Sequence, residues 1–437
     1  MFFHNLDIFC KGIYPWPYRE RKNGPGDGTM EVGIEKRVNK FWAVCERYLD
    51  DDFLGELEAK FDGWQYRSGL DEGSIVDACE FLSHLRFGER LSEYLNSLYK
   101  KEPDYPAEAM LKAVFLMDLK GMVHYSDVIQ YLSSHKDKAL LLGFKRDARS
   151  GEVLSPKYKN FWYFINKRLV KKGWDTVFRL LREECVIEGR NHDISIGHRV
   201  MEDATPIESH RNDKEASYSG HYKVKGYKLD TITDSDYDIP LAKMVLDINA
   251  DESKCFILQH ATLLEDGITV HDTWIDCGYC DYPNLAWAGI NGITAHHKIS
   301  SNWVYNPKGT VEAIKREYQK YWKEEDFKAD ADLDYMLRYL YAHGKYEHVG
   351  AYFRNIAMER YAKNPYAYLK DYHLRNRQEG RHGYWKEQLR LEQRLRVKGI
   401  KKVDIYLTHN LCTILAVALC RIQHGIKQKL TSVAYIT

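Results

Sequence analysis

Residues 198–204, His-Arg-Val-Met-Glu-Asp-Ala, mark the point where the sequence changes from helical to strand-like patterns. Beyond them, short runs either alternate apolar with polar residues or are apolar throughout, as β-strands do. These runs lie at residues 222–233, 240–248, 272–276 and 293–297. Asp251 is expected to cap a helix over about residues 252–264, between the third and fourth strands. Strands with an intervening helix predict an α/β core.

Helical patterns lie on both sides of this core. Pro106 stands where the first turn of a helix tolerates proline, Ser126 is a candidate N-cap, and a helix over about 156–171 mixes basic with aromatic residues. These helices fit a DNA-binding domain or, alternatively, a plain helical bundle. The expected organisation is an unassigned region 1–75, a helical and DNA-binding domain 76–190, a core in two parts, 191–304 and 371–425, a helical insertion 305–370, and a tail 426–437.

Composition limits the class of protein. The chain has 437 residues, of which 44% are hydrophobic, so it can form a sizeable core and two or three domains. We expect no membrane span, because no run of 18 apolar residues appears, and no signal peptide. Nine scattered cysteines favour a reducing, cytoplasmic setting. The net charge is +1, but residues 371–402 hold ten Lys/Arg and four Asp/Glu, a local +6 that suits phosphate binding or a solvated helix face.

Four functional side chains are spaced along one expected helix, from Tyr372 to about residue 397. Tyr372, Arg375, Glu379 and Lys386 would share a stripe about 60° wide at about 100° per residue. A phenol, a guanidinium, a carboxylate and an ammonium group then face the same place. Geometry alone favours a row of ion pairs on a solvated helix.

Two further acids, Asp203 and Asp276, are each expected at the end of a short apolar strand. Carboxylates are costly to cluster unless a cation joins them. Their hard oxygen atoms suit Mg²⁺ or Mn²⁺. Two such ions about 3.5–4 Å apart can activate an attacking oxygen and stabilise a leaving one in phosphoryl transfer, while nearby cations hold the phosphate.

Several motifs together resemble the DDE transposases of bacterial insertion sequences. They are residues 203–207 (DATPI), 226–228 (GYK), 249–253 (NADES), 275–279 (IDCGY), 394–399 (RLRVKG) and 410–411 (NL), and a helical region at 95–175. One branch of that family also has a Tyr-x2-Arg-x3-Glu-x6-Lys signature, which Tyr372, Arg375, Glu379 and Lys386 match at every spacing. The resemblance covers roughly residues 95–425. It implies a ribonuclease-H-like catalytic core, a mixed sheet flanked by helices, with an all-helical N-terminal domain and a mainly helical insertion.

The resemblance also implies roles for residues and a reaction. Asp203, Asp276 and Glu379 would be the catalytic metal ligands, holding two Mg²⁺ or Mn²⁺ ions. Tyr372, Arg375 and Lys386 would contact phosphates and end DNA, and the lysines of the second strand are further candidate DNA contacts: Lys223, Lys225 and Lys228. Water would cut at the terminal inverted repeats, and the freed 3′-hydroxyl would attack target DNA, with a homodimer assembled on the DNA. Leu229-Asp230 departs from the family, because many relatives carry a His there.

Other interpretations remain open. The chain is alternatively a catalytically idle DNA-binding regulator derived from a transposase, or a ribonuclease-H-like nuclease without strand transfer. Cys277, Cys280, His296 and His297 are a loosely spaced zinc candidate, although core or turn positions explain them better. Glu208, His210 and Arg211, near Asp203, suit either DNA positioning or a solvated loop.

Overall fold

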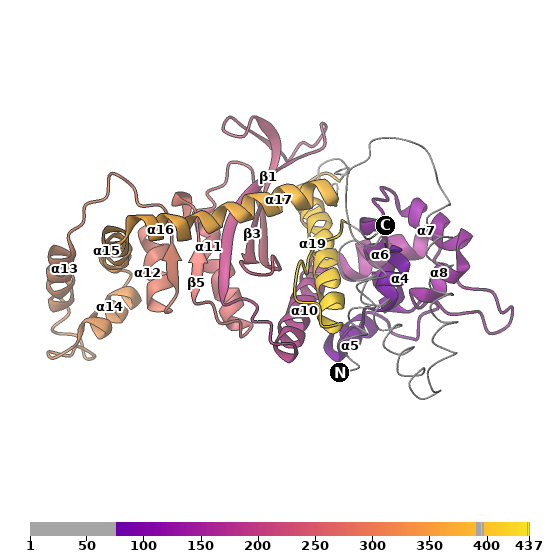
Figure 1. The fold of residues 1–437 in the computed structure, drawn as a ribbon, viewed down its shortest axis with the longest axis horizontal. Helices are drawn as coiled ribbons and strands as arrows, with labels where there is room; N and C mark the ends of the chain where they lie inside the picture. Colours follow the sequence, from indigo (N-terminus) through magenta and orange to yellow (C-terminus); the bar gives the residue numbers. More distant parts are fainter. Residues whose placement is uncertain (1–75, 390–394, 396, 435, 437) are drawn as a thin grey trace, which may run out of the picture. The chain divides into compact units, whose positions relative to one another are not determined.

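The computed structural model describes residues 76–389, 395, 397–434 and 436. The region 1–75 lies outside the described residues, and so do Arg390, Arg394 and Arg396 of the basic segment. Within the described part, helices and strands combine in a mixed α/β arrangement (Figure 1).

One mixed sheet lies at the centre of the α/β part. Its strands are β1 (Arg199–Glu208), β2 (Ser217–Ser219), β3 (Val224–Asp234), β4 (Pro240–Asp247), β5 (Asp272–Trp274) and β6 (Thr294–His296). The order is β2-β3-β1-β5-β6, and β4 also pairs with β3. β1, β3 and β4 are antiparallel neighbours, whereas β5 and β6 run parallel to β1. The prediction of an α/β core with these strands is confirmed.

Helices cover both faces of the sheet. Those that pack on it or follow it are α11 (Ser253–Glu265), α12 (Tyr282–Ile290), α17 (Asn376–Gln388) and α19 (Ile400–Gln423). Successive residues of a strand point to opposite faces. On one face, Gln259 of α11 donates to Glu202 and Asp230; on the other, Gln378 of α17 donates to the Thr231 hydroxyl. Figure 1 shows α17 passing beside β1 and β3, and α17 contacts β1 directly.

The helix expected after Asp251 is present as α11. It begins at Ser253, with Glu252 at the N-cap position. The Asp251 carboxylate nevertheless accepts a hydrogen bond from the Ser253 N–H at 3.2 Å and from its hydroxyl at 2.9 Å. The cap expected from the sequence therefore lies one residue before the assigned one, and its carboxylate still stabilises the first turn.

Helices precede the sheet, as expected for residues 76–190. They are α4 (Ala78–Ser83), α5 (Glu89–Ser97), α6 (Ala107–Leu119), α7 (Tyr125–Ser134), α8 (Lys136–Leu141), α9 (Tyr158–Tyr163), the π-helix η1 (Phe164–Leu169) and α10 (Val170–Asn191). Ser126 is not an N-cap: α7 begins one residue earlier, and Asp127 accepts from the His124 N–H at 3.0 Å. The helix expected over 156–171 is instead α9 and η1, and the chain then continues into α10 through Val170, whose φ is 42°.

The helix α19 is long and apolar enough to cross a membrane by length and composition, although we expected no such segment. Of its most apolar window, 89% is buried inside the protein. Its residues pack against α10, α6 and β4. This burial is what the core helix of a folded domain requires.

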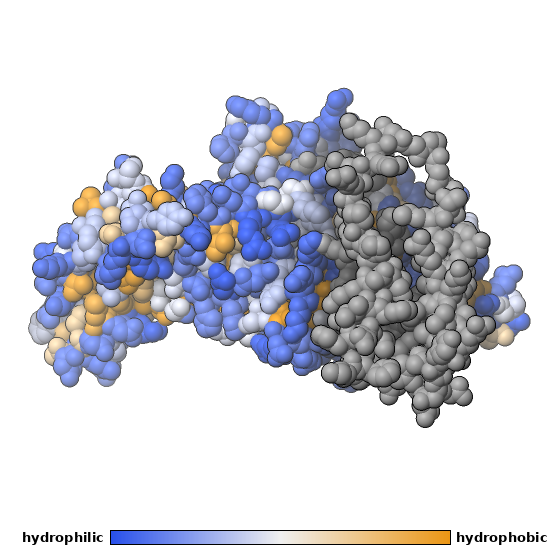
Figure 2. All heavy atoms as spheres, in the orientation of Figure 1, coloured by the Kyte–Doolittle hydropathy of each residue, from blue (hydrophilic) through white to orange (hydrophobic). Residues whose placement is uncertain are grey.

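The insertion between the two parts of the core is helical, as expected. Its helices are α13 (Pro307–Gln319), α14 (Leu333–Ala342), α15 (Tyr346–Lys363) and α16 (Pro365–Tyr372). It has a core of its own, in which Tyr318 stacks on Phe327 and meets Tyr339 edge to face. In Figure 2, hydrophobic residues also appear at the surface of this region; exposed apolar side chains there include Ile356 and Leu369.

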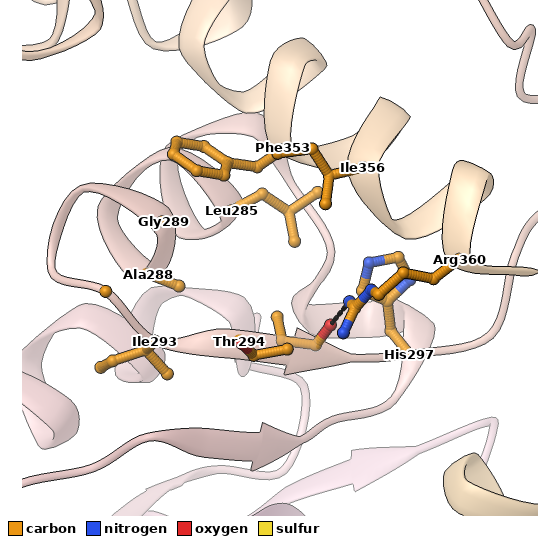
Figure 3. Close-up of a pocket in the computed structure, with 11 residues that line it drawn as sticks. Leu285, Ala288, Gly289, Ile293, Thr294, His297, Phe353, Ile356 and Arg360 are labelled. Atoms are coloured by element: carbon orange, nitrogen blue, oxygen red, sulfur yellow. Dashed lines mark hydrogen bonds between the residues drawn. The ribbon is translucent and has the colours of Figure 1, made fainter. Parts of the chain in front are cut away.

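The insertion packs closely against the helix α12. A Cβ atom on Gly289 would lie 2.3 Å from the Phe353 ring, so only glycine allows this approach of α12 to α15. Beside the contact, α12, β6 and α15 enclose a cavity of about 280 Å³ (Figure 3). Its lining is mainly apolar, and Arg360 donates across one side of it to the Ala295 carbonyl at 3.1 Å. None of the acids or cations expected at the active site lines this cavity.

Candidate active site

Asp203 lies in the middle of β1, not at a strand end as the sequence suggested. β1 is longer than expected, because its pairing with β3 continues to Glu208 opposite Gly226. Asp203 pairs with Thr231 in the register, so its side chain shares the face of the sheet on which α17 packs. The side chain is 16% exposed.

Asp276 follows β5 after one residue. It is the N-cap of the short 3-10 helix η2 (Cys277–Tyr279), and the Tyr279 N–H donates to its carbonyl at 3.0 Å. β5 is parallel to β1 and adjacent to it. The carboxyl ends of the two strands therefore point the same way, and Asp276 lies beyond this end of β5. The Asp276 carboxylate accepts a hydrogen bond from the Tyr372 hydroxyl at 3.4 Å.

Glu379 reaches the same place from beyond the insertion. The single helix expected from Tyr372 onward is instead broken: Tyr372 ends α16, η3 (His373–Arg375) forms a 3-10 turn, and Glu379 lies in the first turn of α17. The 100° spacing therefore does not apply across the break. Tyr372 and Glu379 nevertheless both approach the two aspartates: the Tyr372 hydroxyl bonds to Asp276, and the charge of Glu379 acts on Asp203.

Arg375 joins the carboxylates. Its guanidinium lies 3.0 Å from Glu379 Oε1 and 3.8 Å from Asp203 Oδ2. Its charge also interacts with Asp276, and its carbon lies 5.9 Å from the centre of the Tyr372 ring. The structure thus brings together all three predicted acids and two of their predicted neighbours. Glu379 is the most accessible of them, with 60% of its side chain exposed.

The electrostatics reflect this crowding of negative charge. Burial raises the pKa of Asp203 to about 7; Arg375 opposes this shift, whereas Glu379 and Asp276 add to it. Burial also raises the pKa of the Tyr372 hydroxyl to about 12, so it remains a donor to Asp276 at neutral pH. For Arg375, burial opposes the charge, but the surrounding acids and Tyr372 raise its pKa above the usual value.

Lys386 and the lysines of the β2–β3 region have different surroundings. Lys386, in the last turn of α17, donates to the Pro206 carbonyl of β1 at 2.5 Å. Lys228 is buried and bonds to Glu252 at 2.6 Å, so its ammonium group does not face solvent. Lys225 donates to the Asp213 carbonyl at 2.5 Å, whereas Lys223 is exposed with a φ of 60°. Of these three lysines, only Lys223 is an exposed candidate for a phosphate contact.

Some arginines of the basic segment, residues 371–402, are held in ion pairs with acids of the same protein, although the net charge of the segment suggests free cations. Arg381 forms an ion pair with Asp238, and Arg377 lies 3.7 Å from the same carboxylate. Both arginines therefore help to fix α17 to the turn between β3 and β4. Lys398, Lys401 and Lys402 remain candidates for contacts with phosphates.

Asp203, Asp276 and Glu379 offer carboxylate oxygens, the donor type that divalent cations such as Mg²⁺ prefer. Among the residues that the structure describes, no group of three or more Asp, Glu, His or Cys side chains is close enough to hold a metal ion. The cation between Asp203 and Glu379 is the guanidinium of Arg375. Glu379 and Asp276, whose charges add to the burial that raises the pKa of Asp203, nevertheless form with Asp203 a centre of negative charge of the kind that hard cations neutralise. The donors fit such a cation in type and charge, and Glu379 must leave Arg375 to join the others.

The zinc candidate is not assembled. Cys277 Sγ lies 3.7 Å from the Lys298 carbonyl, and Cys280 Sγ lies 3.4 Å from the Asp276 carbonyl. His296 stacks on Trp274 and pairs with Asp272. These contacts explain the side chains as parts of the turn and the sheet, and within the described part of the chain they do not form a group that could hold a metal ion.

Two features of the site were missed from the sequence. Tyr222 lies near enough to Asp203 and Asp276 for their charges to add to the effect of burial, which raises its pKa to about 12. On the opposite face of the sheet, a buried polar cluster lies behind Asp203; it consists of Glu202, Asp230, Gln259, His260 and Tyr279. The alternation of β1 could have indicated that Glu202 and Asp203 face opposite ways, but not what Glu202 would meet.

Comparison with known proteins provides no further assignment: no family model, curated protein or solved structure matches the chain.

Proposed function

We propose that the chain is a transposase that cuts DNA at the ends of an insertion sequence and joins those ends to target DNA. The observation that carries the proposal is the meeting of Asp203, Asp276 and Glu379 around Arg375, from three separate parts of the chain. An ion-pair row on a solvated helix does not require the two aspartates. The sequence motifs that resemble DDE transposases contain these same residues.

The fold part of the proposal is a ribonuclease-H-like core. It is supported by the mixed sheet with helices on both faces and by the helical insertion between Asp276 and Glu379. We propose further that the helices before the sheet bind end DNA. Residues 157–174 contain six Lys/Arg and no Asp/Glu, and they expose the aromatic side chains of Tyr158, Trp162 and Tyr163. Positive charge with exposed aromatic rings suits phosphates and unstacked bases.

Asp203, Asp276 and Glu379 would hold the divalent cations, Mg²⁺ or Mn²⁺. When bound, two such ions supply an activated oxygen nucleophile and stabilise the leaving oxygen in each in-line displacement at phosphorus. The burial of Asp203 excludes water from one side of the site and lowers the local dielectric constant, which strengthens the interaction of its carboxylate with a cation.

Arg375 and Tyr372 have roles of their own in this proposal. Arg375 neutralises the acids while the site is without DNA; in the complex its guanidinium would donate to a phosphate in the bidentate manner that arginine favours. The Tyr372 hydroxyl holds one Asp276 oxygen by a hydrogen bond and so orients the carboxylate. Cutting two element ends and joining them requires at least two subunits on the DNA, so we propose a homodimer in that complex, acting in the cytoplasm.

The proposal is tested by replacing each acid. Asp203→Ala, Asp276→Ala and Glu379→Ala should each abolish Mg²⁺-dependent cleavage of end DNA and leave DNA binding intact, as measured by nicking and gel-shift assays on one DNA. Glu387→Ala is the matched control, because Glu387 is an exposed acid of the same helix. Full cleavage by any of the three variants would remove that residue from the site.

The same assays separate the alternatives. An idle regulator binds end DNA but does not nick it with any divalent cation. A nuclease without strand transfer nicks the DNA but yields no joined product when pre-cut ends and target DNA are supplied. Inverted repeats on both sides of the gene, with short direct duplications outside them, would support the transposase.

A further inference from the structure

The buried polar cluster has no role in the reaction as proposed so far. Glu202, Asp230, His260 and Tyr279 are completely buried, and Gln259 is nearly so. Polar groups at such depth are costly unless they are hydrogen-bonded, and a network of this kind is one of the features that fix a unique arrangement of a core.

The hydrogen bonds connect four elements. Gln259 of α11 donates to Asp230 of β3 at 2.9 Å and to Glu202 of β1 at 3.3 Å. The second Asp230 oxygen lies 2.8 Å from the Tyr279 hydroxyl, at the end of η2. The second Glu202 oxygen lies 3.1 Å from His260 Nε2. The cluster therefore ties both central strands and the η2 turn to a single helix.

The protonation of the cluster is consistent with its burial. Burial raises the pKa values of Glu202 and Asp230 well above their usual range, and the charge of Glu202 adds to the effect of burial on Asp230. Burial lowers the pKa of His260 to about 3. Neutral carboxyl groups beside a neutral imidazole avoid the cost of unpaired buried charge.

Two members of the cluster are directly connected to the proposed metal ligands through the backbone. Glu202 precedes Asp203 on β1, so fixing its side chain on one face of the sheet fixes Asp203 on the other. Tyr279 closes the turn that begins at Asp276, since its N–H donates to the Asp276 carbonyl at 3.0 Å. Its own carbonyl accepts from Asn284 Nδ2 at 3.0 Å. The hydrogen bond between Tyr279 and Asp230 thus connects the turn of Asp276 to the strand beside Asp203.

We propose that Tyr279 is a positioning residue, whose hydrogen bond to Asp230 sets the distance between the Asp203 and Asp276 carboxylates and so the affinity of the site for a divalent cation. This inference rests on the proposed function. Partners that orient metal ligands from behind change metal affinity by about 10- to 100-fold when they are lost. Since Tyr279 acts through a turn and touches neither carboxylate, the lower end of that range is expected.

The experiment uses the full chain and three variants. Tyr279→Phe removes only the hydroxyl. Tyr318→Phe is the matched control, because Tyr318 is an equally buried tyrosine whose hydroxyl bonds to the Lys328 backbone inside the insertion. Asp230→Asn keeps the shape of the carboxyl group and can still bond to both Gln259 and Tyr279. It is the conservative variant, which should preserve the position of Tyr279.

Two readouts are independent of cleavage. Calorimetric titration of the DNA-free protein with Mn²⁺ should give a Kd about tenfold weaker for Tyr279→Phe, and a Kd within about twofold of the parent for Tyr318→Phe and Asp230→Asn. Amide hydrogen exchange should become faster at residues 276–280 in Tyr279→Phe alone. In cleavage assays, the Mn²⁺ concentration for half-maximal rate should rise with little change in KM for DNA.

The outcomes separate this inference from the proposed function. Unchanged exchange at 276–280 together with an unchanged Mn²⁺ Kd in Tyr279→Phe overturns the positioning role, whatever the acid-to-alanine variants show. If exchange at residues 276–280 is faster in Tyr279→Phe but the parent protein binds no Mn²⁺, the proposed metal site is wrong. This inference is then overturned with it. Equal loss of Mn²⁺ affinity in Tyr279→Phe and Tyr318→Phe assigns the effect to general destabilisation and also overturns it.

Discussion

Glu202 and Asp203 are neighbours on one strand, yet their carboxyl groups have opposite surroundings. Glu202 points into the layer between the sheet and α11, is sealed from solvent and bonds to neutral partners. Asp203 points toward α17, where a guanidinium and two other carboxylates surround it at the edge of solvent. The pKa of both acids is raised by burial, but only Asp203 has charged partners that a ligand can replace.

The comparison teaches how one β-strand can serve two purposes. Alternation of side chains gives a strand two independent faces at consecutive positions. One face can carry a hydrogen-bonded network that holds the fold together, while the other retains like charges that oppose stability. Crowded acids are a usual cost of function, because catalytic groups are arranged for the reaction and not for the fold.

The largest expected effect concerns the sealed acid. Glu202→Ala should lower the free energy of unfolding by about 4 kcal/mol, because it leaves a cavity and removes partners from Gln259 and His260. Glu202→Gln, which keeps the shape and can bond to both, should cost about 1 kcal/mol. Urea unfolding at pH 7 measures both. Equal costs for alanine and glutamine would mean that the hydrogen bonds of Glu202 contribute little.

Asp203, on the other face of the strand, should behave in the opposite way. The pKa of Asp203 is raised from 3.8 to about 7, so the folded state favours the neutral form, and its stabilising contribution is lost as the pH rises through this window. Asp203→Asn should therefore raise the free energy of unfolding by about 3 kcal/mol at pH 8. The gain should vanish near pH 4. Melting curves of the metal-free protein between pH 4 and pH 8 test the sign of this change in stability. If Asp203→Asn is less stable than the parent at pH 8, the contrast drawn between Glu202 and Asp203 is wrong.

A smaller effect is expected at the cation that joins the acids. Arg375→Ala should reduce cleavage of end DNA about 30-fold, or about 2 kcal/mol of activation free energy, through loss of a phosphate contact. The cleavage rate of Arg375→Lys should lie between those of Arg375→Ala and the parent, because lysine offers a point charge in place of a bidentate donor. Arg377→Ala is the control, since Arg377 lies beside Asp238 instead. Equal losses at both arginines would assign the effect to the net charge of α17.

The smallest effect is expected at the far end of α17. Lys386→Met removes the hydrogen bond to the Pro206 carbonyl and should lower the free energy of unfolding by about 1 kcal/mol. The same variant reports on the proposed phosphate role: a cleavage defect larger than about fivefold at saturating DNA exceeds what this loss of stability explains. Parallel melting and cleavage measurements on one preparation separate the two roles.

The strands could be predicted because their apolar patterns are local. Residues 222–233 and 240–248 alternate or remain apolar over enough positions for the β period to be clear. The approach of Asp203, Asp276 and Glu379 was not local, and it could be expected only through the resemblance to DDE transposases. Physical reasoning from the sequence left Glu379 in a row of ion pairs, and its pair with Arg375 is indeed present.

Other features could not be predicted because they depend on tertiary contacts. Residues 372–376 (YHLRN) contain neither proline nor glycine, so nothing in them indicates the break between α16 and α17. Lys228 alternates with apolar residues as an exposed lysine would, yet Glu252 neutralises it in the interior. Asp203 was placed at a strand end because the apolar run stops there, whereas pairing with β3 extends β1 to Glu208.

The position of the insertion has a consequence for the synthesis of the protein. Asp203 and Asp276 leave the ribosome before helices α13 to α16, and Glu379 follows only after them. A chain whose translation stops anywhere within the insertion therefore lacks one of the three acids and also α19, the helix that fills the core. Incomplete copies of this protein would therefore lack the core helix and part of the proposed site together, so premature termination would not leave a folded chain that carries two of the three acids.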